Sequence, residues 1–290
     1  GGAGLRFLLE PTASPLTAEL IARIREGNPA ARFYFHAPLS PPDALQGARL
    51  AFGSPLQPIY DLSAADVILS LDADFLAAGP FSLRYARAYA DRRRDPAAGM
   101  NRLHVAESTL TGTGGSADHR LRVRTGEIQA LLEAVLAGVA STNAASSAGL
   151  PEIVASALEA GGARTLSDDA GRWVAAVARD LVAHAGAGVV IPGERQPPAV
   201  HALAHALNTV LGNVGRTVRF TESPLVDAGA PSHSIEELAR EMAAGAVQTL
   251  VILGGNPVYT APVDLEFGRL LRSIPRTVYL GLYENETARS

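Results

Sequence analysis

The chain has 290 residues, 47% of them hydrophobic, which is enough for one large or two ordinary domains. Its formal net charge of −4 argues against a nucleic-acid-binding surface as its main function. It has no cysteine and all 25 basic residues are arginine, which excludes disulfides, cysteine-bound metals or clusters in this segment, and a Schiff-base or P-loop lysine. No apolar run reaches the roughly 18 residues of a membrane span. We therefore expect neither a nucleic-acid partner nor a membrane-spanning segment.

Short apolar runs predict strands along the whole chain. Several are almost continuously apolar, such as 67–69, 189–191 and 250–253. Such runs are typical of strands buried on both faces of a parallel sheet. The expected strands are 32–35, 66–71, 102–106, 120–123, 188–191, 217–220, 249–253 and 277–282.

Amphipathic helical segments alternate with these strands. Two of them begin with good N-cap residues, Ser167 and Ser234, and Glu237 follows Ser234 at capping-box spacing. Alternating strands and helices indicate an α/β protein with Rossmann-like domains, whose mainly parallel sheets are flanked by helices. The expected helices are 15–25, 126–139, 167–183, 198–211 and 234–243.

The region 141–149 is small and polar, and it is interpreted as a linker or a long surface loop. It divides the chain into two halves of similar length, each with its own strands and helices. We therefore expect two α/β domains.

A buried strand runs directly into Gly254, Gly255, Asn256 and Pro257. Ligands of open α/β sheets bind outside the carboxyl ends of the strands. Glycine permits close backbone approach, and asparagine can hydrogen-bond a ligand or its own turn. The sequence favours a ligand-binding loop and an ordinary strand-to-helix turn about equally.

In the first half, the corresponding strand runs into Asp72 and Asp74. Two acids at a strand end can hold a metal or a ribose hydroxyl. They can equally cap the next helix or bond a turn, and this interpretation is favoured because no further metal ligands are evident.

A third segment, 103–120, follows a strand and is rich in hydroxyl groups and glycine. Glu107 is placed to bond a ribose, and the run containing Ser108 and Thr111 could cradle a phosphate with backbone N–H groups. The segment contains neither G-x-G-x-x-G nor G-x-x-x-x-G-K-[ST], so it lacks the dinucleotide fingerprint and the P-loop.

His201 and His205 have the i, i+4 spacing that can chelate a metal, but the glutamate of H-E-x-x-H and a third ligand are missing. No serine lies in a G-x-S-x-G elbow, so the sequence gives no support for a hydrolase triad. We name no catalytic residue and no metal ligand.

Taken together, these segments resemble the middle α/β domains of the molybdopterin oxidoreductases of the dimethyl-sulfoxide-reductase family. That family holds molybdenum with two pyranopterin guanine dinucleotides, and its Gly-x-Asn-Pro strand end meets a guanine dinucleotide. The resemblance covers nearly the whole chain. The matching motifs are Gly254-Gly255-Asn256-Pro257, Glu107 with Thr111 and Ala117-Asp118, Arg124-Thr125-Gly126, Leu211-Gly212-Asn213-Val214-Gly215 and Glu286-Thr287-Ala288.

Two departures separate the chain from the family pattern. Asp72-Ala73-Asp74 stands where the family has a first Gly-x-Asn-Pro, and Glu107-Ser108-Thr109 stands where it has Asp-Pro-Arg. These changes resemble a divergent branch, the molybdopterin-oxidoreductase-like subunit of the quinol-oxidising alternative complex III. In that branch the fold persists as an electron-transfer scaffold without pterin.

The resemblance implies a discontinuous arrangement, with 30–148 as one domain and 1–29 joined to 149–290 as the other. It also implies that the chain is a fragment of a longer protein. The remaining iron–sulfur and C-terminal barrel regions, and other respiratory subunits, would be its partners. The parent would be periplasmic or membrane-associated in a bacterium.

Three functions are consistent with the sequence. The first is a non-catalytic, cofactor-free segment of a redox protein. The second is the part of an active molybdenum enzyme that binds the guanine dinucleotides through Gly254–Pro257, Glu107 and Asp118. The third is a stand-alone α/β protein that binds a small ligand. Asp72 and Asp74 distinguish the first two, because carboxylates repel a pyrophosphate.

Overall fold

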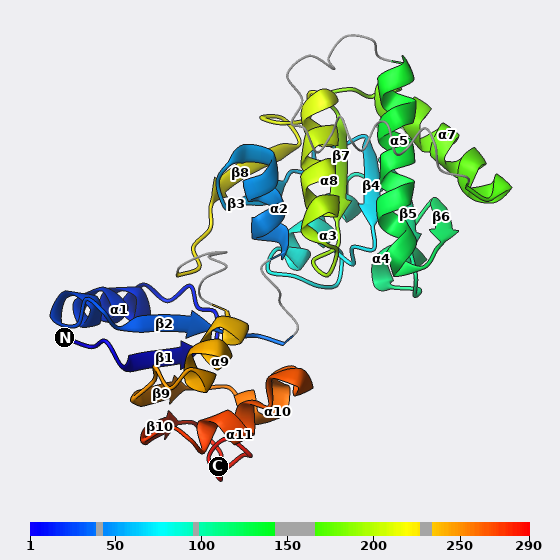
Figure 1. Cartoon of the computed structure of the whole chain (residues 1–290). Helices are drawn as coiled ribbons and strands as arrows, with labels where there is room; N and C mark the ends of the chain where they lie inside the picture. Colours follow the sequence, from blue (N-terminus) through cyan, green and yellow to red (C-terminus); the bar gives the residue numbers. More distant parts are fainter. Residues whose placement is uncertain (39–42, 95–98, 143–165, 227–233) are drawn as a thin grey trace. The chain divides into compact units, whose positions relative to one another are not determined.

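The computed structural model describes residues 1–38, 43–94, 99–142, 166–226 and 234–290 (Figure 1). The chain forms two compact units. Unit 1 consists of Gly1–Pro41 and Pro224–Ser290, and unit 2 consists of Pro42–Ser223. Most of the expected linker at 141–149 lies outside the described residues. No helix in the described part of the chain is long and apolar enough to span a membrane.

Unit 1 contains a parallel four-stranded sheet in the order β10-β9-β1-β2. The side chains on one face of this sheet form a core with α9 and α11. On the other face, Ile21 of α1 packs on Phe7 and Phe33, whose rings stack 4.5 Å apart. The elements of this unit are β1 (Leu5–Leu9), α1 (Pro15–Gly27), β2 (Arg32–Phe35), α9 (Ile235–Ala243), β9 (Thr249–Leu253), α10 (Pro257–Thr260), α11 (Phe267–Leu271) and β10 (Arg276–Leu280).

Unit 2 contains a second parallel sheet, in the order β6-β5-β4-β7. Helices α5, α7 and α8 pack on one face, while α3 and the antiparallel pair β3–β8 contribute to the core on the other. The elements are α2 (Asp43–Phe52), β3 (Leu56–Tyr60), β4 (Val67–Leu71), α3 (Ser82–Asp91), β5 (Arg102–Glu107), α4 (Gly112–Gly115), β6 (His119–Arg122), α5 (Ile128–Thr142), α7 (Asp168–Ala183), β7 (Gly188–Pro192), α8 (Pro198–Val210) and β8 (Val218–Glu222).

The prediction of an α/β protein with mainly parallel sheets is confirmed. The predicted strands and helices occur within a few residues of their expected limits, and Ser167 and Ser234 accept hydrogen bonds as N-caps. Sequence reasoning missed the strands β1 and β3, the helices α2 and α3, and the short helices α4, α10 and α11. Strand β3 was hidden because Pro58 interrupts its apolar pattern, and proline is tolerated there because the β3–β8 pair leaves a free strand edge.

The boundaries of the two units differ from those expected. Strand β7 pairs with β4 along its whole length, from Val67↔Gly188 to Leu71↔Pro192. The described residues 166–223 therefore belong with 43–142, and the divisions fall at 41/42 and 223/224 rather than near 30 and 148. The arrangement is still discontinuous, because unit 1 takes residues from both ends of the chain.

Candidate functional site

Asp72 lies at the carboxyl edge of the unit 2 sheet, directly after β4. Its backbone is left-handed, with φ 56°. Its carboxylate accepts hydrogen bonds from Ser108 N at 3.3 Å, Thr125 Oγ1 at 3.1 Å and Gln196 Nε2 at 3.1 Å. These donors follow β5, β6 and β7, so this one carboxylate joins the loops after all the strands of the sheet.

Two more carboxylates at this edge are bound in the same way. Asp74 Oδ1 accepts from Thr113 N at 2.9 Å and from Thr113 Oγ1 at 2.8 Å. Glu107 is only 1% exposed, and it accepts from Thr111 Oγ1 at 2.7 Å and Arg120 Nε at 2.5 Å. Each acid therefore binds hydroxyl, guanidinium or backbone N–H donors of the protein itself.

The short helix α4 lies directly against Glu107. Thr111 caps this helix by accepting from Gly114 N at 3.0 Å. A Cβ at Gly114 would lie 1.8 Å from Glu107 Oε1, so only glycine fits between the helix and the carboxylate. The glycine-rich run 112–115 thus packs closely on a buried carboxylate.

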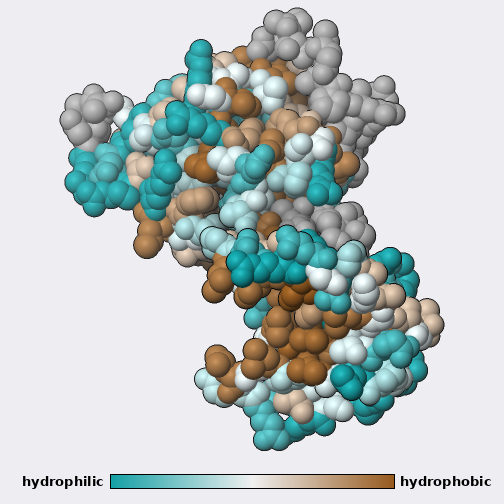
Figure 2. Space-filling view, turned by 90° about the vertical axis from the view of Figure 1, so that its left-hand side faces the viewer, coloured by the Kyte–Doolittle hydropathy of each residue, from teal (hydrophilic) through white to brown (hydrophobic). Residues whose placement is uncertain are grey.

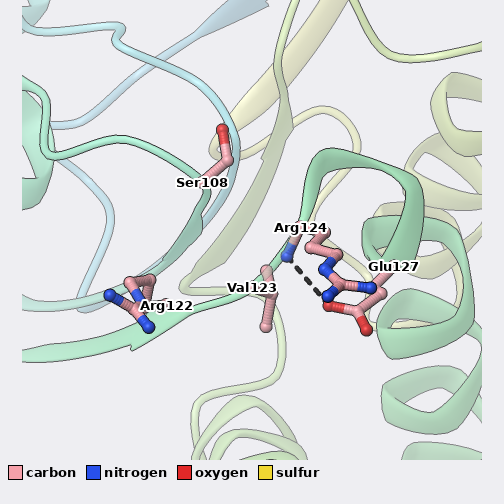
Figure 3. A pocket seen from close by; sticks show the side chains of 5 residues that line it. All are labelled: Ser108, Arg122, Val123, Arg124 and Glu127. Atoms are coloured by element: carbon pink, nitrogen blue, oxygen red, sulfur yellow. Dashed lines mark hydrogen bonds between the residues drawn. The ribbon is translucent and has the colours of Figure 1, made fainter.

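A hollow of about 530 Å³ opens beside these acids, lined by Ser108, Arg122, Val123, Arg124 and Glu127 (Figure 3). The two arginine side chains lie on either side of Val123 and do not converge on one point. Glu127 adds a negative charge, and its carboxylate accepts from Arg124 N at 2.9 Å. The hollow therefore lacks the convergent positive charge of an anion site.

Asp118 lies away from the other predicted acids. It precedes β6 and accepts a hydrogen bond from Leu103 N at 2.8 Å, near the amino end of β5. Burial alone would raise the pKa of Asp118, but hydrogen bonds from Arg93 and Leu103 outweigh it and lower the pKa. The structure therefore does not bring Asp118 together with Glu107.

In unit 1, the loop after β9 contains Gly254 and Gly255 in the left-handed region, at φ 76° and 68°. Asn256 donates to Glu286 Oε2 at 2.6 Å and accepts from Thr287 Oγ1 at 2.8 Å. Tyr279 donates to the carbonyl of Gly255 at 3.0 Å. The Gly-Gly-Asn-Pro loop and the Glu286-Thr287 motif thus bind each other, which accounts for both motifs structurally.

A cavity of about 110 Å³ borders this loop and is lined by Leu8, Leu9, Glu10, His36, Pro38, Gly254, Gly255, Asn256, Pro257 and Thr260. Glu10 packs against the loop, since a Cβ at Gly254 would lie 3.3 Å from its Oε2. His36 Nε2 lies 3.1 Å from Thr260 Oγ1, and burial lowers the pKa of His36.

Sequence reasoning missed Thr125, Gln196, Glu10 and His36 as neighbours of these two edges. A usable signal existed for the last two, because Glu10 and His36 are the first residues after β1 and β2. In a parallel sheet such positions share one edge with the residues that follow β9. Thr125 was noted only as part of the Arg124-Thr125-Gly126 motif, and no comparable local signal marked Gln196.

His201 and His205 are buried in α8. Neither ring nitrogen of His205 has a hydrogen-bond partner among the described residues, and the ring lies against Phe52 and Phe220. Burial lowers the pKa of His201 to about 4 and that of His205 to about 3. Within the described ranges, no group of three or more His, Asp and Glu side chains is arranged to hold a metal ion.

Comparison with known proteins gives similarity in structure only. No family model and no curated protein matches the sequence. Acetylene hydratase from Pelobacter acetylenicus has a similar structure, with a TM-score of 0.70 and 12% identity over 98% of this chain. A chain of the formyltransferase/hydrolase complex from Methylorubrum extorquens, solved with methylofuran, has a TM-score of 0.55 and 15% identity over 98% of this chain.

The chain spans 48% of the acetylene hydratase chain and 76% of the chain from the formyltransferase/hydrolase complex. At these identities the comparisons establish a shared fold. They support the α/β architecture across nearly the whole chain, including both units.

Proposed function

We propose that this chain is a non-catalytic, cofactor-free α/β segment of a molybdopterin-oxidoreductase-like redox protein. Two lines of support converge. The sequence motifs resemble the dimethyl-sulfoxide-reductase family, and acetylene hydratase, a molybdenum/tungsten enzyme of that family, shares the fold over 98% of the chain. The role proposed for the segment is structural: it holds other redox-active regions of a longer protein or of a respiratory complex.

The observation that carries this proposal is the set of bonded carboxylates at the unit 2 edge. Asp72, Asp74 and Glu107 already accept the hydroxyl and backbone N–H donors that a phosphate would need. A single phosphate charge about 5 Å from one carboxylate is disfavoured by about 3 kcal/mol at an effective dielectric constant of about 20. These residues therefore do not fit the pyrophosphate of a guanine dinucleotide.

The unit 1 edge supports the same conclusion less strongly. Asn256 is engaged by Glu286 and Thr287, and Glu10 lies against Gly254 and Gly255. A diphosphate approaching the two glycines would meet the Glu10 carboxylate first. Binding there would require Glu10 to move or to be paired with a cation.

Metal and pterin analysis of the full-length protein, purified from its native cells, tests the proposal. We expect molybdenum, tungsten and extractable fluorescent pterin to be far below one equivalent. Stoichiometric metal and pterin would overturn the proposal and favour an active molybdenum enzyme.

The second candidate function is the guanine-dinucleotide-binding part of such an enzyme. It is favoured by the Gly254–Pro257 loop and the cavity of about 110 Å³ beside it. Titration with guanosine diphosphate distinguishes the two functions when wild type is compared with Glu10→Gln. Binding by wild type that is lost in a Gly254→Val variant would support the second candidate. If neither the wild type nor the Glu10→Gln variant binds guanosine diphosphate, the cofactor-free function is supported.

A further inference from the structure

Among the described residues of unit 1, no helix lies over one half of one face of the sheet. On the opposite face, α9 and α11 pack on side chains from all four strands, including Leu250 of β9 and Tyr279 of β10. On this face, α1 covers β1 and β2 through Ile21, which packs on Phe7 and Phe33, and Val226 packs against the same cluster. Strand β10 contributes no buried side chain on the α1 face.

The uncovered area is apolar. In the β9–β10 register, Val278 lies beside Val251 and Leu280 beside Leu253. Val251 and Leu253 are half-buried, whereas Val278 and Leu280 are 47% and 67% exposed. We call these four residues the β9–β10 face. In keeping with this, unit 1, the lower body in Figure 2, has an apolar, hollowed area on the side turned to the viewer.

The dimensions of this face indicate what would cover it. Purely parallel sheets are normally covered by helices on both faces. Neighbouring strands are about 4.8 Å apart, and packed helices about 8–10 Å apart. One helix therefore covers about two strands, as α1 does here, and the β9–β10 face has room for one more helix beside α1.

The charge of the face adds a second requirement. Arg276 lies on the same side of β10 as Val278 and Leu280, because side chains alternate along a strand. It is exposed, and it forms no ion pair within the described part of the chain. A helix that packs on this face would be stabilised there by an acidic residue close to Arg276.

We propose that the β9–β10 face docks one amphipathic helix of a partner polypeptide, with apolar residues at i, i+3, i+4 and i+7 and an acidic residue facing Arg276. This face adjoins the loop after β9, because Gly254 N donates to the carbonyl oxygen of Leu280 at 2.8 Å, but none of its four residues lines the cavity beside that loop. The proposal therefore goes beyond the cofactor-free role and does not depend on it.

The absence of cysteine from the chain makes a clean test possible. Val278→Cys places a single thiol of this segment on the β9–β10 face, and Val263→Cys is the matched control, because Val263 is 87% exposed and lies in the turn before α11. Each variant is produced in the native cells as the full protein with its natural partners. Maleimide modification of the peptide carrying each thiol is followed by mass spectrometry, in the native assembly and in denaturant.

We expect the thiol of the Val278→Cys variant to react at least about tenfold more slowly than that of the Val263→Cys variant in the native assembly, and equally fast in denaturant. A cross-linker attached to the thiol at position 278 should then capture a segment of a different polypeptide with the helical pattern stated above. Equal native rates would overturn the proposal. Capture of a second copy of this chain, of another part of the same chain, or of a segment without that pattern would also overturn it.

A second pair of variants tests the contact without a cysteine. Leu280→Glu places a charge on the face at an already exposed position and should remove the captured partner from the purified protein. Val263→Glu should retain it. Circular dichroism controls for folding, and retention of the partner by a folded Leu280→Glu protein would contradict the proposal.

Discussion

Replacing Gly114 by alanine tests how closely α4 is packed on the buried Glu107. The new Cβ would lie 1.8 Å from Glu107 Oε1 and 2.4 Å from its Cδ, so the carboxylate or the helix must move by more than about 1 Å to restore an ordinary contact. If Glu107 moves, it loses its bonds to Thr111 and Arg120 while it remains buried. Breaking such a buried charged network costs about 3–5 kcal/mol, and we expect this loss in the stability of unit 2.

Gly115 is the matched control, because nothing lies within 4 Å of the Cβ it would gain. Gly115→Ala should change stability by less than about 1 kcal/mol. The assay is urea unfolding followed by the fluorescence of Trp173, the only tryptophan, which lies in unit 2. This probe reports on unit 2 even if the two units unfold separately.

A double-mutant cycle makes the test stricter. In a Glu107→Ala background the alanine at position 114 has no carboxylate to displace, so its cost should fall to that of Gly115→Ala. Equal stabilities of the two single alanine variants in the wild-type background would refute the reasoning. A full Gly114→Ala penalty that persists without Glu107 would refute it too.

Three further predictions concern other parts of the chain. Burial lowers the pKa of His205 to about 3 from an ordinary value near 6.5, so the unfolded state takes up a proton first as the pH falls. The contribution of neutral His205 to the free energy of unfolding is therefore fully present above pH 6.5 and is lost as the pH falls toward 3, by about 2 kcal/mol at pH 5. His205→Leu should reduce the difference between the urea midpoints measured at pH 7.5 and pH 5, and an unchanged difference would contradict the lowered pKa of His205. Asn256→Ala removes the bonds to Glu286 and Thr287 and should speed amide exchange in 284–290, while exchange in β9 stays near wild type; unchanged exchange in the tail would contradict it. Gly193→Ala would put a Cβ 2.1 Å from the Asp72 carbonyl oxygen and should lower the Trp173-monitored stability of unit 2, whereas Gly171→Ala, with open space around it, should not; equal effects would count against the close packing of these two loops.

The sequence by itself determined the fold class and most of the elements. Apolar runs such as 67–69 and 189–191 are buried in the parallel sheet of unit 2, and Ser167 and Ser234 cap the helices that they precede. These features depend on neighbours only a few residues away, so periodicity and side-chain chemistry were sufficient to find them. The alternative that the Asn256 side chain bonds its own turn was available from the sequence, but that side chain bonds Glu286 and Thr287, which are 30 and 31 residues further along the chain.

Tertiary structure alone decided which residues meet and where the units divide. Asp72 receives bonds from Thr125 and Gln196, which are distant in sequence and reach it only because β6, β5, β4 and β7 lie side by side. Asp118, although close to Glu107 in sequence, lies at the other end of β5, because a strand separates the two positions in space. The β4–β7 pairing likewise placed 166–223 in unit 2. Strand order is set by non-local pairing and packing, which no local pattern encodes.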